Sequence, residues 1–298
     1  NKALGANYVF NLRKGWMDLG NDLMVRILDS LRNKRERKPG WVVRTVREIF
    51  PWETEARSEL LDGLDWESLS KRYNLFGSLD SSILGIPQEA IEELIKLLPE
   101  EIDPDTASKV LEKNRLELER DYTLPNEIDR VWRPRKAARF FNRENVLGRR
   151  IEALLLEAEE ALKSGMDPGS EAYDGWRIEL GELIEKVQET IRNDFMVSND
   201  QLELLLSIAR KGPGYVGGKL TGAGSGGCVC IFVREEKAEE LCEYLDEHYY
   251  SVPSNFEAYR EAIASVEDDS IRKEMESNLR KALQDPVSQR RVVSFSRG

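Results

Sequence analysis

The feature that most constrains this chain is the glycine-dense stretch at residues 218–228, which reads Gly-Lys-Leu-Thr-Gly-Ala-Gly-Ser-Gly-Gly-Cys. It holds five glycines in eleven residues. Without a Cβ, glycine lets the backbone adopt positive φ and approach another group closely. Apolar, β-branched and aromatic residues follow at 228–233, and a second strand-like segment precedes it at 215–220. The pattern predicts two strands joined by a wide glycine turn.

Two nucleotide-binding patterns resemble this stretch only in part. Gly222, Gly224 and Gly227 satisfy the spacing of a dinucleotide-binding loop, but that loop must open a helix, and here a strand follows. A P-loop requires Ser or Thr after its lysine, whereas Lys219 is followed by Leu220. Both patterns are therefore excluded. The stretch is either a plain glycine-rich hairpin turn or a loop of another family.

The first part of the chain is predicted to be helical. Apolar residues recur every three or four positions from Val9 to Ile27, which predicts one long helix ending near Leu31. Shorter helices interrupted by prolines follow from Lys38 to Tyr122, one of them starting after Pro87. The apolar stripe of the first helix is expected to be exposed, and hence to cause self-association, if a covering domain is absent. Its residues are Val9, Leu12, Trp16, Leu19 and Leu23.

The second part is predicted to alternate helices with the hairpin. Ser198 and Gln201 are spaced as a capping box, which predicts that the Ser198 hydroxyl caps a helix beginning there. A closing edge strand is expected at 291–295. The remaining predicted helices cover about 136–162, 170–195, 236–249 and 257–283. The predicted fold class is α+β, mostly helical with a small antiparallel sheet.

Composition excludes several classes of function. The formal net charge of −11 disfavours general binding to nucleic acid or anionic membranes. The three cysteines are too few for a disulfide framework and are expected to be buried, and the one histidine, His248, leaves little material for zinc sites or Ser-His-Asp catalysis. No long apolar run or signal peptide is present in these residues, so we expect a cytoplasmic protein without a membrane partner.

The order Thr-Gly-Ala-Gly-x-Gly-Gly-Cys at 221–228 resembles the third signature motif of the galactokinase branch of the GHMP kinases. Segments 180–184, 192–195 and 198–203 fall in the order found before this motif in galactokinases. Weaker similarity covers 136–160 and 1–31, while 36–130 and 251–298 match no family. The chain departs from the family at Val187-Gln188, where galactokinases usually carry Ser-His, and at Ser225, often a large aromatic, which leaves the sugar unnamed. Gln188 is either functional or simply an exposed helix position.

The resemblance implies three parts: a long helix at 1–35 like the end of the kinase N-terminal domain, a helical insert at 36–130, and a GHMP kinase C-terminal-like domain at 131–298. It implies an active-site loop and, at Phe10, an aromatic residue beside the sugar. ATP and Mg²⁺ would be the cofactors and a monosaccharide the substrate. No catalytic residue or metal ligand is assigned within this chain. The loop residues are Thr221, Gly222, Ala223, Gly224, Ser225, Gly226 and Gly227.

The leading hypothesis is part of an ATP-dependent sugar 1-kinase that phosphorylates the anomeric hydroxyl of a monosaccharide. In the resembled family the phosphate loop and the catalytic Asp and Arg precede the segment that this chain matches, so the chain is expected to lack the catalytic half and to be inactive alone. The first alternative is a non-catalytic sugar or nucleotide sensor built on the same fold. The second is an acidic helical scaffold with a coincidental glycine turn.

Overall fold

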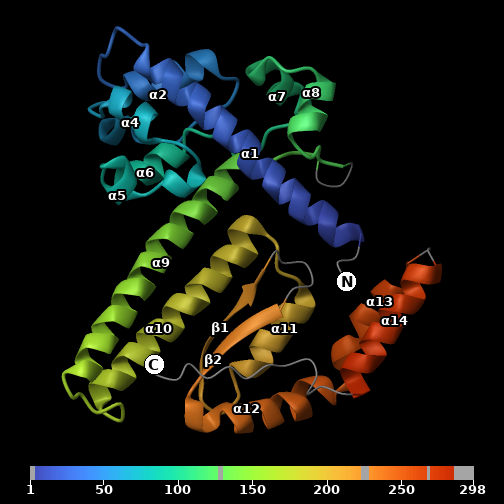
Figure 1. The fold of residues 1–298 in the computed structure, drawn as a ribbon. Coiled ribbons are helices and arrows are strands. Elements are labelled where there is room, and N and C mark those ends of the chain that lie inside the picture. The colour runs from blue at the N-terminus through green and yellow to red at the C-terminus, as the bar shows by residue number, and fades with distance from the viewer. Residues whose placement is uncertain (1–3, 127–129, 223–227, 267–268, 285–298) are drawn as a thin grey trace. The chain divides into compact units, whose positions relative to one another are not determined.

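The computed structural model describes residues 4–126, 130–222, 228–266 and 269–284. Within them the chain is mainly helical and contains one antiparallel sheet of two strands, so the predicted α+β class is confirmed (Figure 1). The chain forms two compact units. We call them the helical unit, which comprises Leu4–Glu152 and Glu189–Val197, and the hairpin unit, which comprises Ala153–Gln188 and the described residues after 197.

Helix α1 (Leu4–Arg32) runs through the helical unit, as its periodicity predicts. The expectation that its apolar stripe is exposed is wrong. Trp16, Leu19 and Leu23 have 0% of their surface exposed, because they lie in one core with residues of the short helices that follow. This packing also explains why α1 and residues 36–130 form one unit, although the sequence suggested a boundary near residue 35.

Short helices surround α1 in the helical unit (Figure 1). Helix α6 begins directly after Pro87, as expected, and the Asp103 side chain caps α7 by accepting from the N–H groups of Asp105 and Thr106. The short helices are α2 Trp41–Ile49, α3 Ser58–Leu61, α4 Trp66–Arg72, α5 Ser81–Leu84, α6 Gln88–Ile95, α7 Pro104–Leu111 and α8 Arg115–Asp121.

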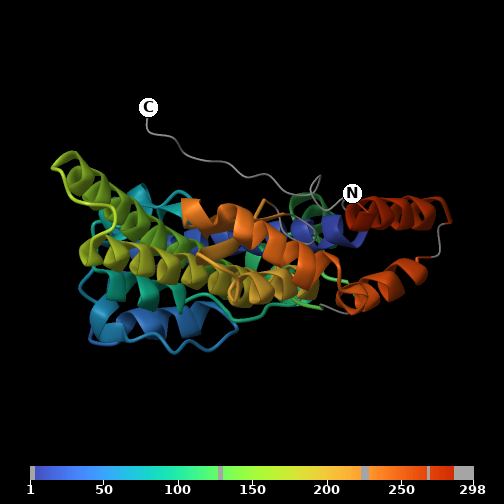
Figure 2. The ribbon, with the colours of Figure 1, turned by 90° about the horizontal axis from the view of Figure 1, so that it is seen from below.

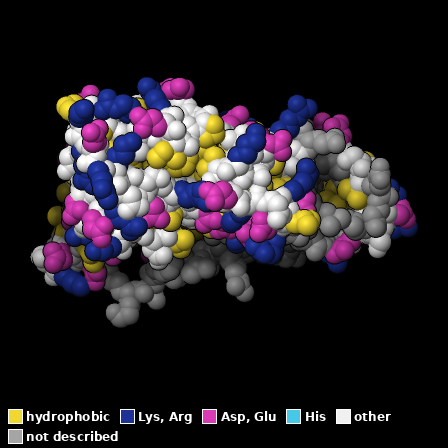
Figure 3. All heavy atoms as spheres, turned by 90° about the horizontal axis from the view of Figure 1, so that it is seen from above, with side chains coloured by type: hydrophobic (Ala, Val, Ile, Leu, Met, Phe, Trp, Pro, Cys, Tyr) yellow, Lys and Arg dark blue, Asp and Glu magenta, His cyan; other side chains and the backbone are white. Residues whose placement is uncertain are grey.

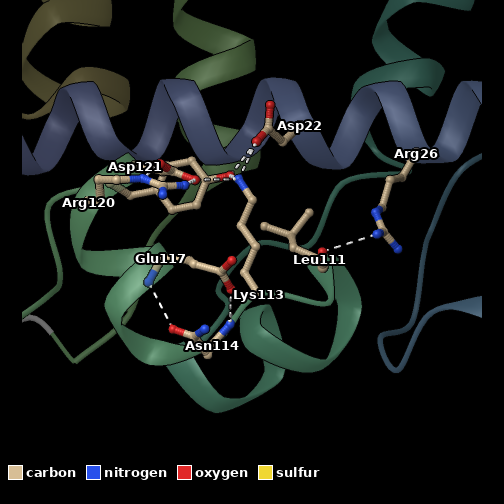
Figure 4. A network of polar contacts seen from close by, with 9 residues as sticks. Asp22, Arg26, Leu111, Lys113, Asn114, Glu117, Arg120 and Asp121 are labelled. Atoms are coloured by element: carbon tan, nitrogen blue, oxygen red, sulfur yellow. Dashed lines mark hydrogen bonds and ion pairs between the residues drawn. The ribbon is translucent and has the colours of Figure 1, made fainter.

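A polar network fastens the end of α8 to α1 within the helical unit (Figure 4). The Lys113 ammonium donates to the Tyr122 hydroxyl at 2.7 Å and lies 2.9 Å from the Asp121 carboxylate and 3.2 Å from that of Asp22. Burial favours the neutral amine, but these hydrogen bonds outweigh burial and raise the pKa of Lys113. Hydrogen bonds from Arg120 and Lys113 lower the pKa of Asp121 to about 2. Lys113 and Asp121 are therefore both charged at neutral pH, and the ion pairs of Lys113 with Asp121 and Asp22 stabilise the contact between α8 and α1.

The hairpin unit holds the sheet between helices (Figure 1). Strand β1 (Tyr215–Thr221) pairs with β2 (Cys228–Val233) as predicted, with Leu220 opposite Val229. Figure 2 shows α13 and α14 beyond α12. The helices are α9 Pro134–Lys163 and α10 Glu171–Thr190, each shared with the helical unit, then α11 Asp200–Ala209, α12 Ala238–Leu245, α13 Glu257–Ala264 and α14 Asp269–Gln284.

The cap of α11 and the exposure of the cysteines differ from what the sequence predicts. The Ser198 capping box is wrong: Asn199 is the N-cap of α11 and its side chain accepts from the N–H of Leu202 at 2.9 Å. The expectation of buried cysteines is also wrong, since Cys228 and Cys230 are exposed on alternate positions of β2 and Cys242 is half-buried. The strand expected at 291–295 lies outside the described residues.

The charged side chains are distributed over the surface in both signs. On the face drawn in Figure 3, Lys and Arg side chains are interspersed with Asp and Glu side chains, and hydrophobic side chains appear between them. The structural description includes no helix that is both long and apolar enough to span a bilayer.

Candidate active-site hairpin

The described part of the predicted active-site loop is its entry. Thr221 is the last residue of β1 and pairs with Cys228, and both Thr221 and Gly222 are exposed. Gly222 has φ +81°, a conformation that L side chains rarely adopt, so glycine is required where the chain leaves the strand. The other predicted loop residues, 223–227, lie outside the described residues.

Close backbone contact seats β1 on α10. A Cβ added to Gly181 would lie 2.0 Å from the carbonyl oxygen of Val216, and one added to Gly217 would lie 3.1 Å from the Cα of Gly181. The backbones of α10 and β1 are therefore in direct contact, and a side chain at Gly181 or Gly217 would push them apart. The next residue, Gly218, faces α11, where an added Cβ would lie 2.7 Å from Leu206. The glycines of β1 thus allow it to pack between two helices.

Gln188 links α10 to the end of β1. Its side chain is 1% exposed, and its Oε1 accepts from the Leu220 N–H at 2.7 Å. Its Nε2 donates to Glu203 Oε1 at 2.6 Å. The Ser198 hydroxyl donates to the same carboxylate oxygen, also at 2.6 Å. The interpretation of Gln188 as an exposed helix position is therefore wrong.

A second polar anchor holds the start of β1. The Tyr215 hydroxyl donates to one oxygen of Glu185 on α10, and the Arg210 guanidinium donates to the other oxygen at 2.6 and 3.0 Å. Burial, together with the hydrogen bond to Glu185, raises the pKa of Tyr215, so this hydroxyl stays protonated at neutral pH. Both ends of β1 are thus bonded to α10, one through Glu185 and one through Gln188.

Phe10, the residue expected beside the sugar, lies on α1 in the helical unit and is 37% exposed. Its role stays a prediction, since the loop entry belongs to the hairpin unit. Among the described residues, no three or more His, Cys, Asp or Glu side chains are grouped so as to hold a metal ion. The described side chains around the loop entry therefore anchor the turn and do not form a metal centre.

Sequence reasoning missed the residues that support the hairpin. Gly181 lay within the family-like segment 180–184, and a glycine inside a predicted helix is itself a signal of close approach. Glu203 also lay within a family-like segment, 198–203, but nothing in the sequence indicated its hydrogen-bond partner. The pairing of Glu203 with Gln188 depends on how α10 and α11 meet.

The family model that matches this chain covers mostly residues of the hairpin unit. The family model described as GHMP kinases C terminal matches residues 174–251. A galactokinase of Dictyostelium discoideum is 40% identical over 73 residues, which are 24% of this chain and 14% of that protein. One of Actinobacillus pleuropneumoniae is 33% identical over 96 residues, which are 32% of this chain and 22% of that protein.

A third galactokinase, from Clostridium acetobutylicum, is 33% identical over 70 residues, 24% of this chain and 18% of that protein. The match thus spans less than a quarter of the length of each of these relatives. The family-model match includes α10 from Asp174, α11, both strands and α12, which are the elements that flank and anchor the entry of the glycine turn. Residues 174–251 of this chain therefore match the GHMP kinase C-terminal domain, and the relatives that are similar to part of the chain are galactokinases.

Proposed function

We propose that this chain contributes the C-terminal domain of an ATP-dependent sugar 1-kinase, which transfers a phosphoryl group to the anomeric hydroxyl of a monosaccharide. The observation that carries the proposal is the anchored glycine turn within the galactokinase-like match. Phosphoryl transfer depends mainly on positioning and on groups that stabilise the charge of the transferred phosphoryl. A strand that is anchored at both ends and leads into exposed residues at the entry of the turn suits such a positioning role.

The role proposed for residues 221–227 is to close over the active site and offer backbone N–H groups toward the phosphates. Glycine backbone can approach a phosphate closely because no Cβ intervenes. The two anchors of β1, through Glu185 and Gln188, would keep the entry of the turn in place as ligands bind. In this proposal Phe10 contacts the sugar.

The magnesium ion and the groups that activate the sugar hydroxyl are not assigned to this chain. In the part of the chain that the structure describes, no three or more His, Cys, Asp or Glu side chains are grouped so as to hold a metal ion, and no Mg²⁺ ligand is assigned to this part. We propose that these groups, and the loop that holds the ATP phosphates, belong to a catalytic half that works together with this domain. ATP is the phosphoryl donor in this proposal.

The experiment is a phosphorylation assay with ATP, Mg²⁺ and a panel of monosaccharides that includes galactose and arabinose. It compares this chain with a version extended upstream to any available start codon, and it detects the sugar 1-phosphate directly. Activity in the extended version supports the proposal, and the accepted sugar names the substrate. If neither version forms product but sugar or nucleotide still binds, the chain is a sensor and the kinase proposal is wrong.

A further inference from the structure

The side chain of Gln188, on α10, forms hydrogen bonds with both β1 and α11. Its amide oxygen accepts from the Leu220 N–H, and its amide nitrogen donates to the Glu203 carboxylate. Leu220 directly precedes Thr221 and Gly222, where the backbone leaves β1 and enters the glycine turn. One buried amide therefore connects two helices to the entry of the turn.

The orientation of this amide is determined by its surroundings. A carboxylate can only accept hydrogen bonds, so the amide nitrogen must face Glu203 and the amide oxygen must face Leu220. The bond to the carboxylate is charge-assisted and correspondingly strong. The Ser198 hydroxyl donates to the same oxygen of Glu203 and helps to hold the carboxylate in place.

We infer that Gln188 is a positioning residue that sets where β1 enters the glycine turn. The Leu220 N–H is buried and bonds to Gln188, and loss of this partner would leave it unsatisfied. The backbone at Leu220 would then be free to shift, and Thr221 and Gly222 would shift with it. The Gln188 side chain is buried and bonds to the strand through the Leu220 N–H, so it acts through the backbone of Leu220.

The catalytic consequence rests on the proposed function. If the turn contributes to phosphoryl transfer, a displacement of its entry lowers turnover, because small misplacements of positioning groups are costly. Substrate binding changes less, since the Gln188 side chain is buried and bonds to the buried backbone N–H of Leu220. The expected signature is a lower kcat with an almost unchanged KM.

The first test measures hydrogen exchange of the Leu220 amide by NMR in the full chain. Gln188→Met keeps the length of the side chain and removes its hydrogen bonds to Leu220, Glu203 and Ser198. The matched control is Gln201→Met, because Gln201 on α11 donates to the Tyr249 hydroxyl at 2.7 Å. We expect the protection factor of Leu220 to fall about tenfold in Gln188→Met, the effect of one lost hydrogen bond, and to stay unchanged in Gln201→Met.

Three results would overturn the inference. They are an unchanged Leu220 protection factor in Gln188→Met, an equal fall in both variants, and an equal fall at every slowly exchanging amide of the unit. The last result would mean that Gln188 supports the fold in general.

A rescue variant distinguishes the hydrogen bond from mere packing. In Gln188→His a neutral imidazole offers one acceptor and one donor, as the amide does, whereas the protonated ring has no acceptor for the Leu220 N–H. Glu203 is the titratable group that faces this position, and its negative charge would raise the imidazole pKa. We expect Leu220 protection near the wild-type level at about pH 8 and a fall at about pH 5.5 in this variant alone. Equal protection at both values would contradict the inference.

The kinetic arm uses whichever form of the protein turns over ATP and sugar. We expect kcat to fall about tenfold in Gln188→Met, in proportion to the lost hydrogen bond, with KM within a factor of about two. A kcat that stays unchanged while Leu220 exchange accelerates would overturn the catalytic consequence. A wild-type protein without turnover refutes the kinase proposal, whereas the exchange result still decides the positioning role of Gln188.

Discussion

At the residue scale, the contact of Gly181 with β1 predicts a large effect of substitution on stability. An added methyl group would lie 2.0 Å from the Val216 carbonyl oxygen, so Gly181→Ala must push α10 and β1 apart. We expect a loss of about 1–3 kcal/mol in the free energy of unfolding, as for other overpacked contacts. Urea denaturation measures it.

Gly175→Ala is the matched control on the same helix, because nothing lies within 4 Å of a Cβ added there. It should stabilise the chain by up to about 1 kcal/mol through helix propensity. Equal effects of the two substitutions would mean that β1 does not sit directly on α10.

Asp121 predicts a pH dependence. Hydrogen bonds from Arg120 and Lys113 lower its folded pKa to about 2, below the value of about 3.9 for an unfolded aspartate. The stabilisation is therefore present above pH about 4 and is lost as pH falls toward about 2. Asp121→Asn should destabilise the chain at neutral pH and less at about pH 3, by urea denaturation at both values. A difference that stays constant with pH would contradict this assignment.

At the element scale, the structure places the N-cap of α11 one residue later than the capping-box pattern did. Asn199→Ala should cost about 1 kcal/mol of unfolding free energy, because the Leu202 N–H loses its side-chain partner. Ser207→Ala in the same helix is the control, since the Ser207 hydroxyl donates to the Leu204 carbonyl of its own helix, and it should change stability little. Helix unfolding followed by circular dichroism compares them, and a neutral Asn199→Ala would restore Ser198 as the cap.

The sequence predicted those elements well whose residue pattern lies within a single continuous segment. The α1 helix, the two strands and their glycine connection could be derived from the sequence because their signals lie within each segment. The cap of α11 was misplaced because Ser198 and Asn199 are adjacent and both are good capping residues. The burial of Gln188 could not be predicted, since its partners Leu220 and Glu203 come from other elements.

At the scale of the whole molecule, the apolar stripe of α1 belongs to the core of the helical unit. We therefore expect Leu19→Ala to lower the free energy of unfolding by about 2–5 kcal/mol through a core cavity, while the sedimentation coefficient stays unchanged. Val25→Ala, at an exposed position of the same helix, should have little effect on either quantity. A loss of self-association in Leu19→Ala without loss of stability would show that the stripe is an interface after all.

The family-model match falls almost entirely within one of the two units. Residues 174–251 lie in the hairpin unit except for Glu189–Val197, whereas the helices of 36–130 build the core around α1 and lie outside the family-model match. The glycine turn and its anchors therefore carry the functional account, and the helical unit contributes Phe10 to it only as a proposal.

The most direct test of the central claim is the formation of sugar 1-phosphate from ATP by the upstream-extended protein, measured beside its Gly181→Ala and Gly175→Ala variants. We expect product with one or more monosaccharides, a clear loss of kcat in Gly181→Ala under conditions where that variant remains folded, and wild-type turnover in Gly175→Ala. The absence of sugar 1-phosphate with every sugar tested, from a folded protein that still binds nucleotide or sugar, would contradict the claim.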